Sequence, residues 1–335
     1  MAKRKSKRKP SKAQRRRRQR LAAVALAGVA ALAYNFWRGD PGQTGVPGPA
    51  PDEQLRVVSW NLENFSGDPQ HHDLERMREL IAELDPDVLA VQEVKDPEAL
   101  ARLLPGWRLA ISEKGGAGRQ RLGIAWRDDR VELVGDTIEH AELALGGRVR
   151  PAFSAYLRGR GGGRGGGPDF WLTVVHLKAM PDGLDQRRQQ WPMLATLSEA
   201  LRARDPGHDG DHVILGDFNS TGPAGGTPAE EQGELATALA GAGLRRVSNA
   251  GGCTAYYDGQ RRDAWKEPSE IDLVWVRELA ESLTADAQVH SGAHCAAHQC
   301  RDFRSTEAYP VRDYASVSDH CPVVLDLRRA DDDPA

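Results

Sequence analysis

The sequence predicts an α/β fold for most of the chain, preceded by a single apolar helix near the N-terminus. Short runs of β-branched and apolar residues alternate with segments of helical spacing from residue 55 to residue 328. Two continuous apolar runs, residues 88–91 and 213–215, are typical of strands that are buried on both faces. Because 40% of the 335 residues are apolar, the chain can bury a core, which excludes disorder throughout.

The N-terminal residues differ sharply in charge from the rest. Of the 45 basic residues, 12 lie in residues 1–20, where no acidic residue occurs. The remaining 33 stand against all 48 acidic residues, so the rest of the chain carries a formal charge of −15. Such a strongly basic segment indicates contact with a membrane or with nucleic acid.

Residues 21–37 are uncharged and would form a helix about 25 Å long, at the short limit for crossing a bilayer. We predict a basic cytoplasmic arm over residues 1–20 and a transmembrane signal anchor or signal peptide over residues 21–37. The basic arm favours an anchor in the cell membrane, with the C-terminal body outside the cytoplasm. Ala31 and Ala33 also fit a cleavage site, which would give a secreted protein. A nucleic-acid-binding arm followed by an Ala-rich core helix is the alternative.

Further elements follow in order along the chain. Residues 38–54 are rich in Pro and Gly and predict a linker, and residues 329–335 form an acidic tail. Strands are expected at residues 55–60, 87–92, 121–127, 149–158, 169–177, 211–216, 271–276 and 321–327.

Helices are expected at residues 72–84 with Asp73 near the start, at 184–204 with an interruption at Pro192, and at 229–240. Residues 159–167 (GRGGGRGGG) predict a flexible hairpin tip, with a phosphate-contacting loop as the alternative.

Polar residues follow several predicted strands at the point where the strand ends. Five residues share this placement: Asn61, Glu93, His176, Asp217 and Asn219. Strand ends at one edge of a sheet can converge on a single pocket.

Three more polar residues lie within or just before predicted strands. Asp272 is inside residues 271–276, whereas Asp319 and His320 lead into residues 321–327. The carboxylate and amide oxygens of such a set suit a hard cation such as Mg²⁺. The His and Asp side chains that remain can move protons and contact phosphate. The set therefore predicts metal-assisted attack of water on a phosphate ester.

Six short segments occur in an order that resembles one known superfamily. They read SWNLEN (59–64), LAVQEV (89–94), VHLKA (175–179), GDFNS (216–220), EIDLVWV (270–276) and SDHCPV (318–323). This ordered set resembles the endonuclease/exonuclease/phosphatase superfamily, which includes deoxyribonuclease-I-like enzymes. The resemblance implies a four-layer α/β sandwich of two packed mixed β-sheets flanked by helices, with a catalytic domain over residues 55–328.

The resemblance also implies which residues bind the metal and the phosphate. Glu93 would be the main Mg²⁺ ligand, with Asn61 close to the metal and Asp319 supporting metal or solvent. Asn219 would hold the scissile phosphate. Arg150, in the segment RVRPAF, resembles a phosphate-contacting Arg of secreted nucleases in this superfamily. A surface Arg beside a strand is the alternative for that position.

Four residues would carry the chemistry by the same resemblance. Asp217 would orient or deprotonate the attacking water, and His320 would act as base or as a charged phosphate clamp. Asp272 would orient His320 and favour its charged form. His176 would face the leaving group as an acid or hydrogen-bond donor. Which of Asp217 and His320 takes the proton of the water stays open.

We therefore predict a Mg²⁺-dependent phosphodiesterase, with Mn²⁺ or Ca²⁺ as alternative metals, that acts as an endonuclease on nucleic acid. A phosphatase or phospholipase acting on inositol phosphates or sphingomyelin is the second hypothesis. A sphingomyelinase would show an aromatic membrane-docking hairpin, whereas the expected hairpin tip is rich in Gly and Arg. The third hypothesis is a non-catalytic membrane-anchored binding module. The membrane would be contacted through residues 21–37, and no protein partner is predicted.

The four cysteines all lie in the C-terminal half, where disulfides would form if this part of the chain is exported. Cys295 and Cys300 are close in sequence and predict a disulfide, which leaves Cys253 and Cys321. The stretch HSGAHCAAHQC (290–300) also permits a structural metal site, although its spacing matches no standard zinc finger.

Overall fold

The computed structural model describes residues 53–161, 167–206, 210–223, 226–257, 264–306, 308–309 and 311–329. The predicted basic arm, the apolar segment 21–37, nearly all of the linker, the centre of the Gly-rich stretch and nearly all of the acidic tail lie outside these residues. Among the helices of the described part, none is long and apolar enough to cross a membrane.

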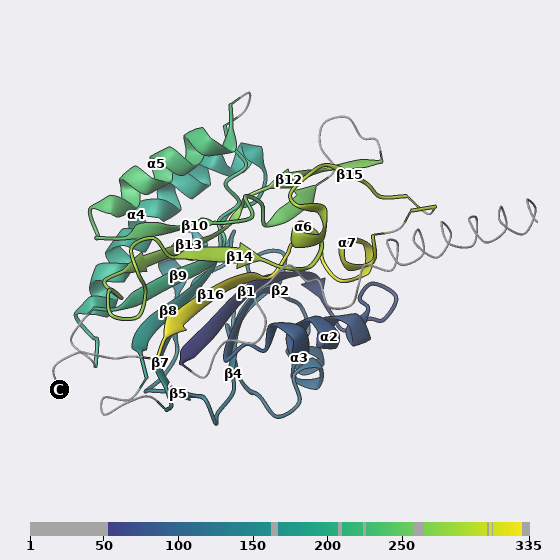
Figure 1. Ribbon diagram of the computed structural model, residues 1–335. Helices are drawn as coiled ribbons and strands as arrows, with labels where there is room; N and C mark the ends of the chain where they lie inside the picture. Colours follow the sequence, from purple (N-terminus) through teal and green to yellow (C-terminus); the bar gives the residue numbers. More distant parts are fainter. Residues whose placement is uncertain are drawn as a thin grey trace, which may run out of the picture. The chain divides into compact units, whose positions relative to one another are not determined.

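A large mixed β-sheet organises the described residues (Figure 1). Its strands are β1 Gln54–Phe65, β2 Val88–Val94, β3 Arg108–Ile111, β4 Arg121–Trp126, β5 Val131–Leu133, β6 Ile138–His140, β7 Ala152–Gly159, β8 Asp169–His176, β9 His212–Asp217, β10 Arg245–Asn249, β13 Asp272–Arg277, β14 Gln288–Ser291 and β16 Val323–Arg328. They lie in the order β3-β4-β2-β1-β16-β14-β10-β13-β9-β8-β7-β5, with β6 beside β7. All eight predicted strands are present. The strands that were not predicted are short, and none contains a long apolar run.

The sheet curls so that its two halves pack face to face. Strand β1 contacts β9, and β2 contacts both β8 and β9, although these strands are far apart in the strand order. Between them lies an apolar core that includes Val57, Val88, Val174 and Leu215. The pairing of β10 with β14 joins the two halves, so the two sheets expected from the resemblance form one continuous strand order.

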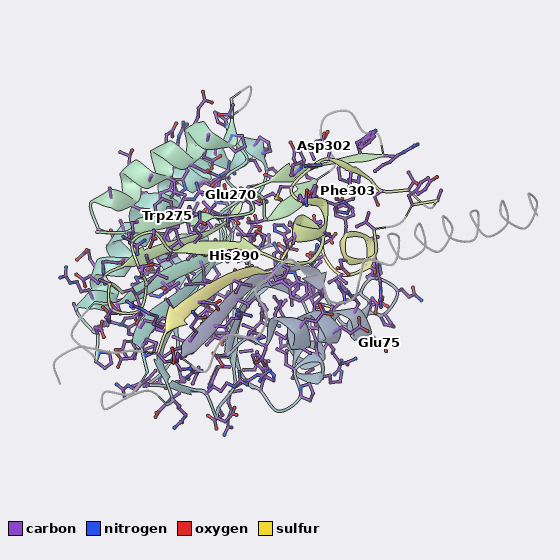
Figure 2. All side chains as sticks on the ribbon, viewed as in Figure 1. Glu75, Glu270, Trp275, His290, Asp302 and Phe303 are labelled. Carbon is purple, nitrogen blue, oxygen red and sulfur yellow. A yellow bond between two sulfur atoms is a disulfide. The ribbon has the colours of Figure 1, made fainter. Side chains whose placement is uncertain are left out.

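Helices cover the outside of both halves (Figure 1). Their bounds are α2 Leu74–Leu84, α3 Pro97–Leu103, α4 Leu184–Arg202, α5 Pro228–Ala240, α6 Ala293–His298 and α7 Arg312–Ser316, with short 3₁₀ helices at Ala141–Ala144 and Pro181–Gly183. Asp73 caps α2, because its side chain accepts a hydrogen bond from the Arg76 N–H. Helices α2 and α3 share a second core with β1 and β2, and α4 and α5 share a third with β8, β9 and β13. Trp275 of β13 lies in this third core (Figure 2).

The predicted interruption of the second helix is wrong. Helix α4 continues through Pro192, although a proline in a helix interior costs about 3 kcal/mol. Trp191, Leu194 and Leu197 are buried in the core beside it. Burial of such side chains contributes about 1.5–3 kcal/mol each, which offsets the lost backbone hydrogen bond.

A small second sheet lies beside the segment that leads into β16, where Ala255 bridges His320. It contains β11 Ala255–Tyr257, β12 Trp265–Ser269 and β15 Phe303–Arg304, in that order. Its buried face packs on α6 and α7 through a cluster that includes Tyr256, Phe303 and Tyr314. Figure 2 places Phe303 beside α6.

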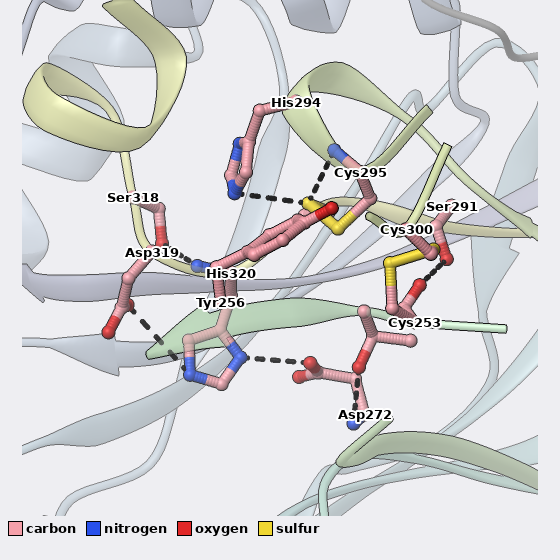
Figure 3. Close-up of a disulfide and its surroundings, with 12 residues drawn as sticks. Cys253, Tyr256, Asp272, Ser291, His294, Cys295, Cys300, Ser318, Asp319 and His320 are labelled. Atoms are coloured by element: carbon pink, nitrogen blue, oxygen red, sulfur yellow. Dashed lines mark hydrogen bonds and ion pairs between the residues drawn. A yellow bond between two sulfur atoms is a disulfide. The ribbon is translucent and has the colours of Figure 1, made fainter. Parts of the chain in front are cut away.

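The predicted disulfide between Cys295 and Cys300 is wrong. The structure pairs Cys253 with Cys300 and Cys295 with Cys321 (Figure 3). Cys295 lies within α6 and Cys300 just after it. With 3.6 residues per turn, side chains five positions apart point in different directions, so each cysteine meets a different neighbouring segment. Because all four cysteines are disulfide-bonded, none offers a thiolate to the structural metal site that was the alternative for residues 290–300.

Candidate active site

Three candidate residues lie side by side at neighbouring strand ends. Asp217 ends β9 and pairs with His176 of β8 on one side and with Asp272 of β13 on the other. Directly paired residues in adjacent strands point to the same face of a sheet. The Nε2 atom of His176 accordingly lies 3.3 Å from Oδ2 of Asp217.

The other half of the sheet contributes Asn61 and Glu93. The Nδ2 atom of Asn61 donates to Glu93 Oε1 at 3.3 Å and to Asp217 Oδ2 at 3.1 Å, which connects the two halves. Register shifts follow Asn61 in the β1–β2 pairing and Val91 in the β2–β4 pairing. Glu93 also has a left-handed φ of 63°, which costs a non-glycine residue about 1–3 kcal/mol. Such irregularities redirect side chains, and here they aim Glu93 across the sheet edge.

His320 forms a close pair with Asp272 (Figure 3). Its Nδ1 atom lies 2.8 Å from Asp272 Oδ2, while its Nε2 atom lies 3.9 Å from both Asp217 Oδ2 and Asp319 Oδ1. Burial disfavours the charged imidazole, but the carboxylates of Asp272, Asp319 and Asp217 outweigh burial and raise the pKa of His320 well above 6.5. His320 is therefore charged at neutral pH.

His176 is in the opposite state. It is buried, and burial together with the positive charges of Arg150 and His320 lowers the pKa of His176 well below 6.5. Its Nε2 atom faces Asp217 and, at 3.7 Å, Glu93 Oε1, and its buried Nδ1 atom has no hydrogen-bond partner within the described residues. The site thus holds one neutral and one charged imidazole.

The site contains more carboxylates than positively charged side chains, and several of these carboxylates have raised pKa values. Burial, followed by repulsion from Asp272 and Glu93, raises the pKa of Asp217 to about 7. Burial, followed by repulsion from Asp319, raises the pKa of Glu63 to about 7. Burial likewise raises the pKa of Asp319. Glu63 was not predicted; it lies inside the segment SWNLEN, but nothing in the sequence distinguishes it from a surface Glu.

Arg150 and Asn219 lie next to this cluster. Both donate to the carbonyl oxygen of Leu177, Arg150 through Nη2 and Asn219 through Nδ2, each at 3.3 Å. The Asn219 N–H also donates to Asp217 Oδ1 at 2.8 Å. The Nε atom of Arg150 is buried and has no partner within the described residues. Arg150 is therefore a buried cation with a donor that is left over for an anionic ligand.

Two buried hydroxyl groups hold the catalytic segments together. Thr254 Oγ1 accepts the N–H groups of Ile271 and Asp272 at 3.0 and 2.9 Å, and its carbonyl oxygen accepts the Cys321 N–H at 2.7 Å. Ser318 Oγ donates to the Asn61 carbonyl oxygen at 2.7 Å and accepts the His320 N–H at 3.1 Å. Ser318 lies in the segment SDHCPV, whereas no sequence signal marks Thr254.

The donor set suits a hard divalent cation. Asp217, Asp272 and His320 bring ligand atoms within 4.8 Å of one another, and Glu93 is linked to Asp217 through Asn61. Carboxylate oxygens are the ligands that Mg²⁺ and similar ions prefer, and their excess negative charge would be neutralised. Asn61 differs from the expectation, because its Oδ1 atom accepts the Glu63 N–H at 3.0 Å and its nitrogen faces the carboxylates.

All the predicted site residues thus lie in one connected region, at the edge where the two halves of the sheet meet. The cluster of carboxylates and imidazoles at the edge of this curled mixed sheet has the residue types that a metal-dependent phosphoesterase needs.

Comparison with known proteins identifies the family. The model of the Endonuclease/Exonuclease/phosphatase family matches residues 58–320, and the chain belongs to this family. No curated protein sequence matches the chain.

Solved structures share the fold at low sequence identity. The D. rerio TDP2 complexed with single strand DNA product is 15% identical, with a TM-score of 0.53 over 83% of this chain and 100% of that one. The human Nocturnin catalytic domain with bound sulfate is 18% identical, with a TM-score of 0.51 over 83% and 95% of the two chains. A Bacteroides thetaiotaomicron mannosyl-6-phosphatase is 18% identical, with a TM-score of 0.53 over 82% and 99%.

Proposed function

We propose that this protein is a divalent-metal-dependent phosphodiesterase that hydrolyses nucleic acid, with Mg²⁺ as the metal and Mn²⁺ or Ca²⁺ as possible substitutes. One observation carries the proposal. The Asp217 carboxylate lies between the neutral His176 and the charged His320 and accepts a hydrogen bond from Asn61. A carboxylate, a hydrogen-bond donor and a cation are thereby placed around one point, as attack of water on a phosphodiester requires.

Each residue then has a role that follows from its surroundings. Asp217 accepts the proton of the attacking water, because its carboxylate lies between the two imidazoles at the point where the water would attack. His320, kept charged by Asp272, donates through Nε2 to a phosphoryl oxygen. His176 donates a hydrogen bond from a neutral ring, which lowers the cost of negative charge on the leaving oxygen.

The remaining residues bind the phosphate and the metal. Arg150, with its buried unpartnered Nε atom, and Asn219 hold the phosphate that is cleaved. Glu93, with Asp217 and Asp319 nearby, would hold the divalent cation, while Asn61 clamps the carboxylates together. Such a cation polarises a phosphoryl oxygen and lowers the pKa of bound water.

Nucleic acid is the substrate that we favour within the family. Three proteins that share the fold are named for different activities, so the fold does not select a substrate. Only 4 of the 33 basic residues after residue 20 are Lys, and the others are Arg, whose planar fork suits the phosphates of nucleic acid. A phosphatase or phospholipase would use the same site, and a non-catalytic module would leave it unused.

We also propose that the catalytic domain acts outside the cytoplasm, either anchored in the cell membrane through residues 21–37 or secreted. The two disulfides support this proposal, because disulfides persist in oxidising compartments. Protease added to intact cells that express the chain should degrade the catalytic domain, or the domain should appear in the medium. A protease-protected domain with four free thiols contradicts the proposal.

The substrate is tested with the purified full-length chain in oxidised form. Plasmid, RNA, abasic duplex, inositol phosphates and sphingomyelin are offered in parallel with Mg²⁺, Mn²⁺ or Ca²⁺. We expect metal-dependent cleavage of nucleic acid that is lost in Glu93→Ala and retained in Glu75→Ala, a change on the exposed face of α2. Faster hydrolysis of inositol phosphates or sphingomyelin would replace the nuclease assignment, and no hydrolysis of any substrate would support a binding module.

A further inference from the structure

Two exposed aromatic side chains lie close to the site without a part in the proposed hydrolysis. Tyr257 on β11 is 52% exposed, and Trp265 on β12 is 44% exposed. Only four large hydrophobic side chains of the described residues are exposed, and these are two of them. Exposed aromatic residues beside a catalytic site indicate a surface that meets a ligand.

The strand register places these aromatic residues on one face of the small sheet. Tyr257 pairs with Glu267, and Trp265 pairs with Arg304. Paired residues point to the same side, as do residues two apart in one strand, so all four share one face. We call this face, made of Tyr257, Trp265, Glu267 and Arg304, the outer face. The opposite face carries Tyr256, Lys266 and Phe303 and packs on the cluster around α6 and α7.

The outer face continues directly into the active site. Ala255, the first residue of β11, forms an antiparallel bridge with His320. The imidazole of His320 therefore lies on the same side of β11 as Tyr257, and Figure 3 shows it on the side of the strand opposite to the ring of Tyr256. At about 3.3 Å per residue, Tyr257 is about 7 Å along the strand from this bridge, and Trp265 is about 13 Å from it.

We propose that the outer face stacks the unpaired bases of a single-stranded nucleic acid whose phosphodiester lies at His320. This substrate class deepens the proposed nuclease function and rests on it. The two aromatic rings lie on the adjacent strands β11 and β12, two residues apart in register, and match successive bases on one side of the cleaved bond. The exposed Arg304 lies where it can contact the backbone. Stacking accepts any base, because every base has a π-face.

The chemistry of the outer face favours this ligand over the two others that could use it. A membrane would have to bury Glu267 and Arg304 together with the aromatic rings, and charged groups are costly in lipid. A duplex keeps its bases stacked on one another and is bound mainly through phosphate-neutralising cations. The chain has a net charge of −3, and its basic excess is confined to residues 1–20. Stacking on unpaired bases adds about 1–3 kcal/mol per base that does not come from phosphate-neutralising cations.

The test compares substrates with and without bases. Full-length oxidised protein with Mg²⁺ is assayed on a single-stranded oligonucleotide and on bis(p-nitrophenyl) phosphate, which has no bases. Tyr257→Ala and Trp265→Ala should each raise KM for the oligonucleotide by about 5- to 150-fold, with unchanged kcat/KM for the small ester. Tyr257→Phe and Trp265→Phe keep an aromatic ring and should stay near wild type. Tyr309→Ala removes an aromatic side chain that is 60% exposed and lies in the turn after β15, and it is the matched control.

Two results would contradict a stacking role for the outer face. The first is an unchanged KM for the oligonucleotide in both alanine variants. The second is an equal rise of this KM in Tyr309→Ala. Loss of binding to phosphatidylcholine or phosphatidylserine vesicles in the alanine variants, with unchanged oligonucleotide cleavage, would assign the face to a membrane. If the wild-type protein cleaves no phosphodiester, the proposed function fails. Binding of the oligonucleotide to the outer face is then tested separately by fluorescence anisotropy in EDTA, where the alanine variants should bind more weakly than wild type.

Discussion

Asp272 and His320 are joined through a 2.8 Å contact between Oδ2 and Nδ1, although 48 residues separate them in the chain. The segments that carry them are both bonded to Thr254, whose hydroxyl accepts the Asp272 N–H and whose carbonyl accepts the Cys321 N–H. Two disulfides flank these contacts, since Cys253 precedes Thr254 and Cys321 follows His320. The charge of His320 therefore depends on Asp272, and the distance between them depends on a cross-linked scaffold.

Asp272→Asn should decrease the turnover of phosphodiester substrate by about 100- to 10,000-fold, the range of general acid–base contributions. The amide cannot stabilise a charged imidazole, so the pKa of His320 should fall, which NMR titration of the ring would detect. The exposed Asp129→Asn is the matched control and should leave both quantities unchanged. Wild-type turnover in Asp272→Asn would remove the pair from the mechanism.

Thr254→Val should decrease both stability and turnover. Valine has nearly the same shape but cannot accept the N–H groups of Ile271 and Asp272, and a buried polar group without a partner costs about 1–3 kcal/mol. The free energy of unfolding in urea measures the first effect, and kcat measures the second. Thr254→Ser keeps the hydroxyl and should restore most of both; if Thr254→Ser and Thr254→Val behave alike, the hydroxyl has no such part.

The disulfide pairing predicts the number of free thiols and the effect of removing one disulfide. Oxidised protein should contain no free thiol under denaturing conditions. The double variant Cys295→Ser/Cys321→Ser should lose about 2–4 kcal/mol of unfolding free energy, because the open chain gains conformational entropy. Turnover should fall as well, since Cys321 is bonded next to His320. Peptide mapping that links Cys295 to Cys300 would contradict the structure.

His294 should make the stability of the protein depend on pH. Burial lowers its pKa from 6.5 to about 4. Between these values the unfolded chain binds a proton at this position and the folded protein does not, so the free energy of unfolding falls as pH falls. The contribution is about 1.4 kcal/mol per pH unit between pH 6.5 and pH 4. In His294→Gln this contribution is absent, so its unfolding free energy should decline less than that of wild type across this window. Parallel curves for the two proteins would show that His294 titrates normally when folded.

Removal of divalent metal should abolish hydrolysis and lower the melting temperature. A ligand that binds only the folded state adds about 2.7 kcal/mol of stability at 100 times its dissociation constant. Mg²⁺ should therefore raise Tm in the wild-type protein and in Glu75→Gln, but much less in Glu93→Gln. An equal rise of Tm in all three proteins would place the metal away from Glu93.

Local patterns in the sequence are sufficient to predict much of the main sheet and its helices. Strands that contain continuous apolar runs, such as β2 and β9, could be predicted because such runs are buried on both faces of a sheet. The short strands β5, β6 and β14 depend on neighbours that lie far away in the chain, and three or four residues carry no periodic signal. The continuity of α4 through Pro192 also could not be predicted from local sequence, because it depends on core packing on both sides of the proline.

The family, the strand ends and the residue types of the site follow from the amino-acid sequence alone, because they depend on local runs and on motifs in a fixed order. Which atoms face one another depends on the tertiary structure. In the folded chain the nitrogen of Asn61 faces the carboxylates, Glu63 and Thr254 contact site residues, and Cys295 is bonded to Cys321. These relationships join segments that are tens to hundreds of residues apart, so they arise only when the folded chain brings those segments together.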